Sequence, residues 1–162
     1  MTDKKQILVQ VSHRHVHLAR KEIDVLFGKD YRLKKLKQLN QPEEFAAEET
    51  VTLINDGKKL ERVRVIGPGR EQTQIELSRT DANELKMNLP LRESGDLDNT
   101  PGIEIKGPQG KVIIRKGVIL AKRHLHASES EANEIGLKDG DLISIKIPGK
   151  RGLIFNEVMV RI

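Results

Sequence analysis

Short runs of β-branched and other apolar residues, separated by turn residues, recur along almost the whole chain. Most of these runs alternate apolar with polar residues, which is the pattern of a strand with one buried face. Turn signals such as Asn55-Asp56-Gly57, Gly107-Pro108 and Asp139-Gly140 divide them. The runs cover residues 6–12, 49–54, 62–67, 73–78, 102–107, 111–122, 142–147 and 152–162. So many short strands predict a mainly β fold of the barrel or sandwich type.

Helical signals are few. We expect one helix over Leu18–Phe27, ending at Gly28, and a second over Ser128–Ile135, which opens with a serine and a glutamate in capping-box spacing. One further helical turn is expected over Asp81–Lys86. The helices are therefore short additions to a β fold.

The 162-residue chain contains no cysteine. This excludes a disulfide framework, a cysteine-ligated metal site and an acyl-cysteine intermediate. No apolar run approaches the ~20 residues that a membrane-spanning helix needs, and the first residues lack the apolar region of a secretory signal. We therefore expect a soluble, intracellular protein without a membrane partner.

A formal net charge of +5 favours an anionic partner. Single-stranded nucleic acid is not expected, because three Phe and one Tyr cannot supply the usual stacking platforms and 24 acidic residues are interspersed with the basic ones. The densest basic cluster consists of Arg32, Lys34, Lys35 and Lys37. It is interpreted either as a solvated face or as a landing patch for a multiply phosphorylated small ligand.

All five histidines lie in two similar segments, each of which contains Arg-His-x-His, follows an apolar run and precedes a helical signal. The histidines are His13, His15, His17, His124 and His126. Along a strand, side chains two residues apart point to the same side and are ~6–7 Å apart along the backbone, so the imidazoles of one pair can converge on a metal ion. The pattern predicts two metal half-sites at two strand-to-helix corners. His13 would join the first of them only if the strand ran straight.

A catalytic zinc needs a third protein ligand and an open position. Segment 67–78 offers Glu76, on a strand that also carries Gln74, although spacing alone favours an exposed strand carboxylate. The same segment places Arg70 directly after a Gly-Pro-Gly turn, where an anion can approach and a planar guanidinium can hold phosphate in bidentate geometry. One arginine is by itself a weak signal.

These residues are also compatible with two other classes of protein. His15 and His17 with Glu22, and His126 with Glu131, imitate part of the metal motif of cupins, but both glutamates lie in the expected helices. A cupin-like metal enzyme would place its histidines and glutamate along neighbouring sheet surface. The other class is a non-enzymatic basic β-barrel module that binds anionic partners.

Blocks of sequence in a fixed order extend over nearly the whole chain. They are Arg14-His15-Val16-His17-Leu18, Leu26-Phe27-Gly28, Gln41-Pro42, residues 45–51, Gly67-Pro68-x-Arg70, residues 73–82, residues 92–97, Pro101-Gly102-Ile103, residues 117–126 and Asp139-Gly140-Asp141. In this order they resemble the PduL-type phosphotransacylases, the phosphate propanoyltransferase family. The resemblance implies a zinc-dependent phosphate acyltransferase that moves an acyl group between coenzyme A and inorganic phosphate.

The resemblance also implies a fold: mainly β, with two closed β-barrels capped by short α-helices and the active site between them. Residues 1–13 and 120–162 would form the first barrel. Residues 14–27 and 49–119 would form the second, and residues 28–48 a connecting segment.

Carried over residue by residue, the resemblance makes His15, His17 and Glu76 the ligands of one zinc ion. His124 and His126 would be ligands of a second. Members of the family usually continue past the point where this chain stops, with one more histidine for that second site. We therefore expect either a truncated version of a longer protein or a second zinc held by two protein ligands plus phosphate or water.

Arg70 matches the family's phosphate-binding arginine, and Ser94 falls in a block near that site. The substrates implied are acetyl- or propanoyl-CoA and phosphate, with direct attack of phosphate on the thioester, which suits a chain without cysteine. The resemblance further implies a homodimer. Microcompartment forms carry an N-terminal targeting helix, and only a few residues precede the first expected strand here, so we expect a cytoplasmic form.

Overall fold

The computed structural model describes residues 6–12, 14–41 and 43–162. It divides the chain into two compact units: a larger unit of residues 12–121, and a smaller unit that contains residues 6–11 and 122–162. The prediction of a mainly β protein with a few short helices is confirmed. Among the described residues, no helix is long and apolar enough to cross a membrane.

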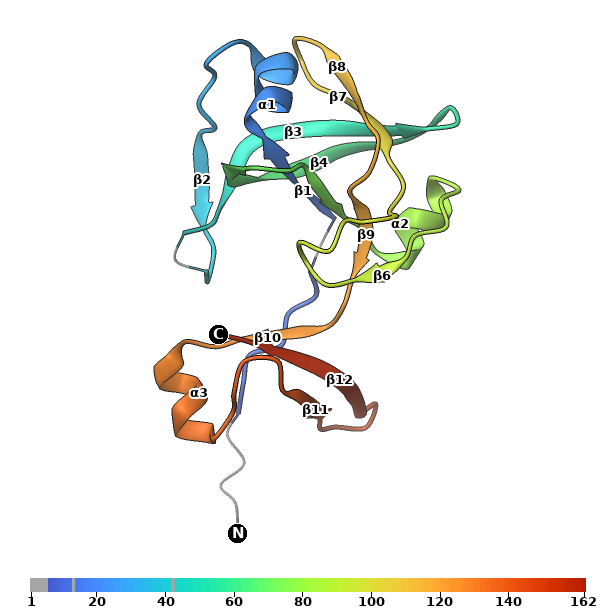
Figure 1. The fold of residues 1–162 in the computed structure, drawn as a ribbon. Coiled ribbons are helices and arrows are strands. Elements are labelled where there is room, and N and C mark those ends of the chain that lie inside the picture. The colour runs from blue at the N-terminus through green and yellow to red at the C-terminus, as the bar shows by residue number, and fades with distance from the viewer. Residues whose placement is uncertain (1–5, 13, 42) are drawn as a thin grey trace. The chain divides into compact units, whose positions relative to one another are not determined.

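The larger unit is built on one curved sheet (Figure 1). Its order is β6-β9-β5-β1-β4-β3-β7-β8, with β2 paired to β3. The closure of a barrel stays a prediction, because the ladder of the described residues ends at β6 and at β8. The elements are β1 (His15–Ala19), α1 (Arg20–Phe27), β2 (Lys35–Gln38), β3 (Phe45–Asn55), β4 (Lys58–Arg70), β5 (Gln74–Glu76), α2 (Arg79–Glu84), β6 (Leu91–Arg92), β7 (Ile103–Lys106), β8 (Lys111–Ile114) and β9 (Val118–Ala121).

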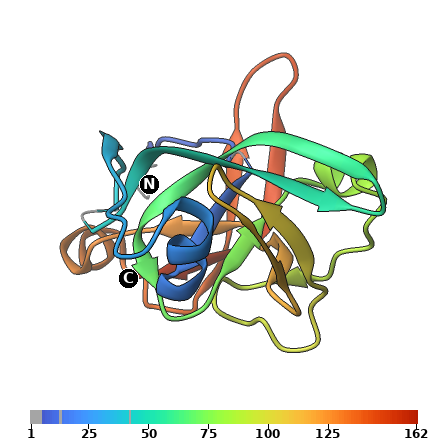
Figure 2. The same ribbon diagram turned by 90° about the horizontal axis from the view of Figure 1, so that it is seen from above.

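The longest strands of this unit, β3 and β4, form a hairpin that is seen from above as a long curved ribbon (Figure 2). The hairpin turns at Asp56 and Gly57, as the turn signal predicts. Both residues have a positive φ, 45° and 72°, which is the backbone of a two-residue type I′ turn. The segment 28–48, expected to be a connection, carries β2 and the start of β3.

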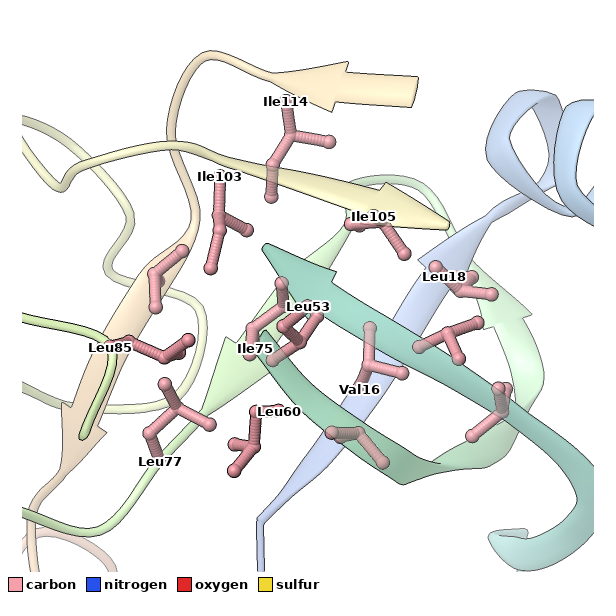
Figure 3. Close-up of a cluster of buried hydrophobic side chains, with 14 of the residues drawn as sticks. Val16, Leu18, Leu53, Leu60, Ile75, Leu77, Leu85, Ile103, Ile105 and Ile114 are labelled. Atoms are coloured by element: carbon pink, nitrogen blue, oxygen red, sulfur yellow. The ribbon is translucent and has the colours of Figure 1, made fainter. Parts of the chain in front are cut away.

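The core of the larger unit lies on one face of this sheet (Figure 3). Along β1, Val16 and Leu18 point into the core and are fully buried, and on the neighbouring β5 Ile75 does the same. Because side chains alternate along a strand, His15 and His17, which alternate with these core residues, must face the other side. The core therefore determines on which face the histidines stand.

The first helix is shorter than the sequence pattern predicts. The expected helix begins at Leu18, but the strand continues to Ala19 and α1 begins at Arg20. Residues 15–19 are strand because β1 pairs with β4 on one side and, through residue 17, with β5 on the other, so tertiary pairing overrides local helical signals. The predicted end at Gly28 is confirmed, and Val25 of this helix is 46% exposed.

The smaller unit consists of a three-stranded sheet and one helix (Figure 1). Strand β12 (Leu153–Arg161) is central, paired parallel to β10 (His124–His126) and antiparallel to β11 (Leu142–Ile147). Helix α3 (Glu129–Ile135) begins with the predicted capping box of Ser128 and Glu131. It ends at Gly136, which has the left-handed conformation that glycine favours.

One predicted strand is wrong. Residues 6–12 are rich in the β-branched and other apolar residues that are typical of a strand, but they form no strand in the structure. Leu8 and Val11 are 76% and 83% exposed. An extended segment becomes a strand only when its backbone groups pair with a neighbour, and no strand of the described residues pairs with this one.

Candidate metal and phosphate site

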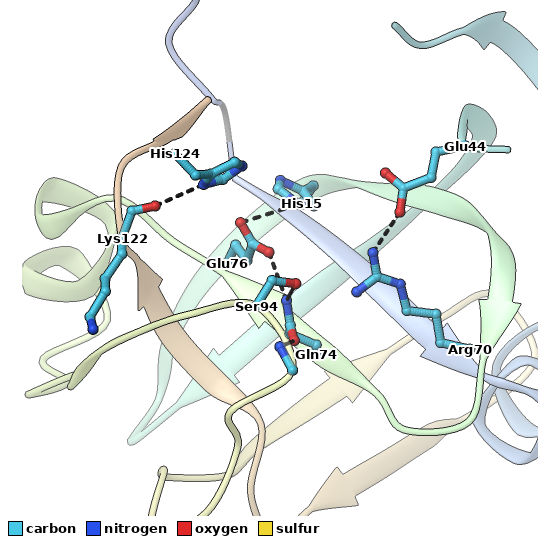
Figure 4. A network of polar contacts seen from close by, with 9 residues as sticks. His15, Glu44, Arg70, Gln74, Glu76, Ser94, Lys122 and His124 are labelled. Carbon is cyan, nitrogen blue, oxygen red and sulfur yellow. Dashed lines mark hydrogen bonds and ion pairs between the residues drawn. The ribbon is translucent and has the colours of Figure 1, made fainter. Parts of the chain in front are cut away.

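Strands β1 and β5 bring the first histidine pair to the residues predicted to complete its site. They run antiparallel, with His15 directly opposite Glu76 and His17 directly opposite Gln74. Directly opposed residues of such a pair have Cβ atoms about 4.5–5.5 Å apart on the same face of the sheet. Two strands thus present four polar side chains together (Figure 4 shows three of them, His15, Gln74 and Glu76).

His15, His17 and Glu76 form the one group of three side chains of metal-ligating types that lie close together in the described part of the chain. Their ligand atoms all lie within 4.8 Å of one another. Nε2 of His15 is 3.6 Å from Oε2 of Glu76, and the two imidazole rings are 5.0 Å apart in an edge-to-face arrangement. Glu76 is buried, contrary to the exposed carboxylate that spacing alone favours. These three side chains can hold a metal ion.

The environment of His17 also fits a metal ligand. Its Nδ1 is buried and has no hydrogen-bond partner. Burial, and then the positive charges of Arg70 and His15, lowers the pKa of His17 from 6.5 to about 2. The ring is therefore neutral at physiological pH, with a lone pair available, and a metal ion requires that form of histidine. A buried polar atom without a partner costs about 1–3 kcal/mol, and a bound ion at this ring fits it.

A hydrogen-bond network lies behind Glu76 (Figure 4). The side-chain amide of Gln74 donates to Oε1 of Glu76 at 2.7 Å and to Oγ of Ser94 at 2.8 Å. The backbone amide of Gly95 donates to Oε1 of Gln74 at 2.8 Å. Ser94, predicted from the family resemblance, is thereby linked to the ligand group through one intervening side chain.

Arg70 lies at the end of β4, next to Ala19 of β1. Its Nη2 donates to Oε1 of Glu44 at 2.5 Å, and its side chain is 34% exposed. A guanidinium has five N–H donors, so one contact with Glu44 leaves donors for an anion. Its charge acts on His17, so the cation and the candidate metal ligands belong to one electrostatic environment.

The second histidine pair lies in the smaller unit, on β10. The rings of His124 and His126 are 4.7 Å apart, again edge to face. Nδ1 of His124 lies 2.8 Å from the carbonyl oxygen of Lys122. Since a carbonyl only accepts, Nδ1 carries the proton and Nε2 is the nitrogen with the lone pair. No third His, Cys, Asp or Glu completes a ligand group with this pair among the described residues.

Other residues matter that sequence reasoning did not single out. Glu44 pairs with Arg70 although 26 positions separate them, and no local sequence pattern predicts such a contact. The sequence identifies Gln74 only as a neighbour of Glu76.

Another residue of the sequence patterns does not join the candidate site. Glu22, part of the cupin-like pattern, is buried in α1 and outside the group of His15, His17 and Glu76. His13 lies outside the described residues.

Comparison with known proteins gives the family. A protein-family model described as phosphate propanoyltransferase matches residues 8–162. The chain belongs to this family. A phosphate propanoyltransferase of Thermotoga maritima is 48% identical over 157 residues, which cover 96% of this chain and 75% of the relative. One of Rhodopseudomonas palustris is 46% identical over 99% of this chain and 71% of the relative. One of Clostridioides difficile is 40% identical over 98% of this chain and 77% of the relative.

The family is one of acyltransferases, and this chain is an enzyme of that class. The cupin-like enzyme and the non-enzymatic module are therefore set aside. The relatives' names refer to phosphate and a propanoyl group.

Proposed function

We propose that this enzyme interconverts acyl-CoA and phosphate with acyl phosphate and CoA, with acetyl- or propanoyl-CoA as the acyl donor. The observation that carries the proposal is the group of His15, His17 and Glu76 in the electrostatic neighbourhood of Arg70. A metal ion and a guanidinium both bind phosphate oxygens, the guanidinium in bidentate geometry. The family membership supplies the acyl-transfer chemistry.

The donor set of two imidazoles and one carboxylate suits zinc, which in catalytic sites takes three protein ligands and keeps a fourth position open. Bound there, zinc would supply Lewis-acid stabilisation of negative charge. The protein's own residues have three tasks: His15, His17 and Glu76 fix the ion, Arg70 binds and orients phosphate, and Ser94 offers a hydroxyl nearby.

The reaction balances without a protein nucleophile. An oxygen of phosphate attacks the thioester carbonyl carbon, a C–O bond forms, and the C–S bond breaks as the electron pair returns to sulfur. CoA leaves as a thiolate and takes a proton from solvent. This direct route agrees with a chain that has no cysteine.

His124 and His126 are proposed ligands of a second zinc ion. The hydrogen bond from Nδ1 of His124 to a backbone carbonyl supports this, because it orients the ring and leaves Nε2 as the donor atom, as is usual for metal-bound histidine. A homodimer, the two closed barrels and a cytoplasmic location stay predictions from the family resemblance.

The experiment that tests the proposed function is release of CoA from a panel of acyl-CoAs in the presence of phosphate, with and without a metal chelator. We expect phosphate-dependent CoA release from short acyl-CoAs that stops on chelation and returns with zinc. The variant Arg70→Lys should raise the phosphate KM, and Arg79→Lys, an exposed arginine of the same unit, serves as the matched control. CoA release at a rate that does not depend on phosphate, or that is unchanged after complete removal of zinc, would contradict the proposal.

A further inference from the structure

We propose that Gln74 is a positioning residue with two tasks: it holds Glu76 for the metal, and it makes the Ser94 hydroxyl a hydrogen-bond donor to a phosphoryl oxygen. This inference deepens the proposed function and rests on it. It is carried by the three hydrogen bonds of one buried amide (Figure 4).

The orientation of the Gln74 amide follows from its neighbours. The backbone N–H of Gly95 can only donate, so the group that it meets at 2.8 Å must be the amide oxygen. The carboxylate of Glu76 accepts, so the group that it meets at 2.7 Å must be the amide nitrogen. The reversed amide would place two donors against each other and two acceptors against each other. Both neighbours therefore select the same orientation.

The first task concerns Glu76. Its Oε1 is occupied by the Gln74 amide, and its Oε2 is the oxygen that lies 3.6 Å from Nε2 of His15. Gln74 is only 2% exposed, so its side chain is held by packing as well as by hydrogen bonds. Such a contact turns one carboxylate oxygen toward the metal ligands and prevents the group from rotating away. Outer contacts of this kind typically change metal affinity about 10–100-fold when removed.

The second task concerns the direction of the Ser94 hydroxyl. The second N–H of the Gln74 amide points to Oγ of Ser94, which therefore accepts. The hydroxyl proton must then point away from Gln74, and among the described residues no acceptor is bonded to it. A hydroxyl in this state has its proton available for an acceptor on the side away from Gln74. An oxygen of phosphate, held by Arg70 and the metal ion, is an acceptor of the required charge.

The loop that carries Ser94 is tied to the same side chain. The Gly95 amide reaches Gln74 with a φ of 97°, a conformation that favours glycine. One glutamine therefore sets the position of a ligand on β5, of the loop at 94–95 and of the hydroxyl on that loop. Removing this side chain should therefore weaken both zinc binding and phosphate binding.

The test uses four variants of the full chain. Gln74→Met keeps the volume and removes all three hydrogen bonds. Gln74→Glu keeps the shape but cannot donate, so the Ser94 hydroxyl must turn toward residue 74. Ser94→Ala removes only the hydroxyl. Gln72→Glu is the matched control, because it adds the same charge at an exposed position two residues away.

Two binding measurements are made without any acyl-CoA: zinc affinity by competition with a chromogenic chelator, and phosphate affinity of the zinc-loaded protein by calorimetry. We expect Gln74→Met to bind zinc about 10–100-fold more weakly. Ser94→Ala should bind zinc within threefold of the parent but phosphate at least fivefold more weakly. Gln74→Glu should weaken phosphate binding at least tenfold, well beyond Gln72→Glu.

The outcomes separate this inference from the proposed function. Zinc affinity of Gln74→Met within twofold of the parent would overturn the first task. Phosphate affinity of Gln74→Glu equal to that of Gln72→Glu would overturn the second, and it decides that question even if Gln74→Met does not fold. Failure of the parent protein to release CoA refutes the acyl-transfer proposal but leaves both binding results standing. A purely structural role would lower the melting temperature and leave both affinities of the folded protein unchanged.

Discussion

Replacing Thr73 with Val tests the contact that joins the end of β1 to the segment leading into β5. Oγ1 of Thr73 accepts a hydrogen bond of 2.9 Å from the backbone amide of Ala19. Both residues are buried, with 3% of Ala19 and 7% of Thr73 exposed. Valine has nearly the same shape as threonine but no acceptor, so the amide of Ala19 would lose its partner where water does not reach it.

The magnitude follows from two opposing terms. A buried amide left without a partner costs about 1–3 kcal/mol. Burial of the methyl group that replaces the hydroxyl stabilises the folded state by up to about 0.8 kcal/mol. We expect Thr73→Val to lower the free energy of unfolding by about 1–2 kcal/mol, which for a chain of this size corresponds to a fall in melting temperature of about 2–8 °C.

The assay combines urea unfolding with hydrogen exchange, because unfolding alone does not say which contact was lost. Thr73→Ser is the control: it keeps the hydroxyl and loses only a buried methyl group. Exchange of the Ala19 amide should be much faster in Thr73→Val and nearly unchanged in Thr73→Ser. Equal protection of this amide in both variants, or a Thr73→Val protein as stable as the parent, would refute the reasoning.

Three further predictions concern the metal and phosphate residues. His17→Ala should remove one equivalent of bound zinc and nearly all turnover while circular dichroism stays that of the parent; full zinc content would show that His17 is not a ligand. Arg70→Lys should raise the phosphate KM about tenfold or more with little change in the KM for acyl-CoA, since an ammonium cannot make a planar two-point contact. During graded chelation at neutral pH, the zinc at His124 and His126 should leave before the other, and phosphate should slow its loss; simultaneous loss of both ions would contradict the ligand assignment.

The sequence predicts those parts of the structure that depend on local chemistry. Ser128 with Glu131 makes the predicted capping box, and Asp56-Gly57 makes the predicted hairpin turn. Each of these features is decided by groups a few residues apart. His15 and His17 belong to the same kind of feature, because the alternation of a strand places both on one face whatever its neighbours are.

Contacts between distant segments depend on strand register, which no local pattern contains. His15 meets Glu76 only because β1 and β5 pair in one register, and a shift by one residue would turn Glu76 to the core face. The sequence offers Glu76 as a candidate, but only the family resemblance assigns it as a ligand, and nothing in the sequence predicts Glu44 as the partner of Arg70. The strand predicted over residues 6–12 is wrong for a related reason. Its residues favour a strand, but a strand forms only when its backbone pairs with a neighbouring strand.

The two Arg-His-x-His corners show how a strand's position controls what an identical motif can do. Strand β1 lies between β4 and β5, and β5 presents Glu76 opposite His15. Strand β10 pairs with β12 alone among the described residues, and the residue of β12 opposite His124 is Met159, which offers no charge to a cation. A flanking strand thus presents a third candidate ligand at one corner, and nothing equivalent flanks the other within the described residues. The difference in metal retention that we expect arises from the sheet and not from the histidines, which have the same spacing in both corners.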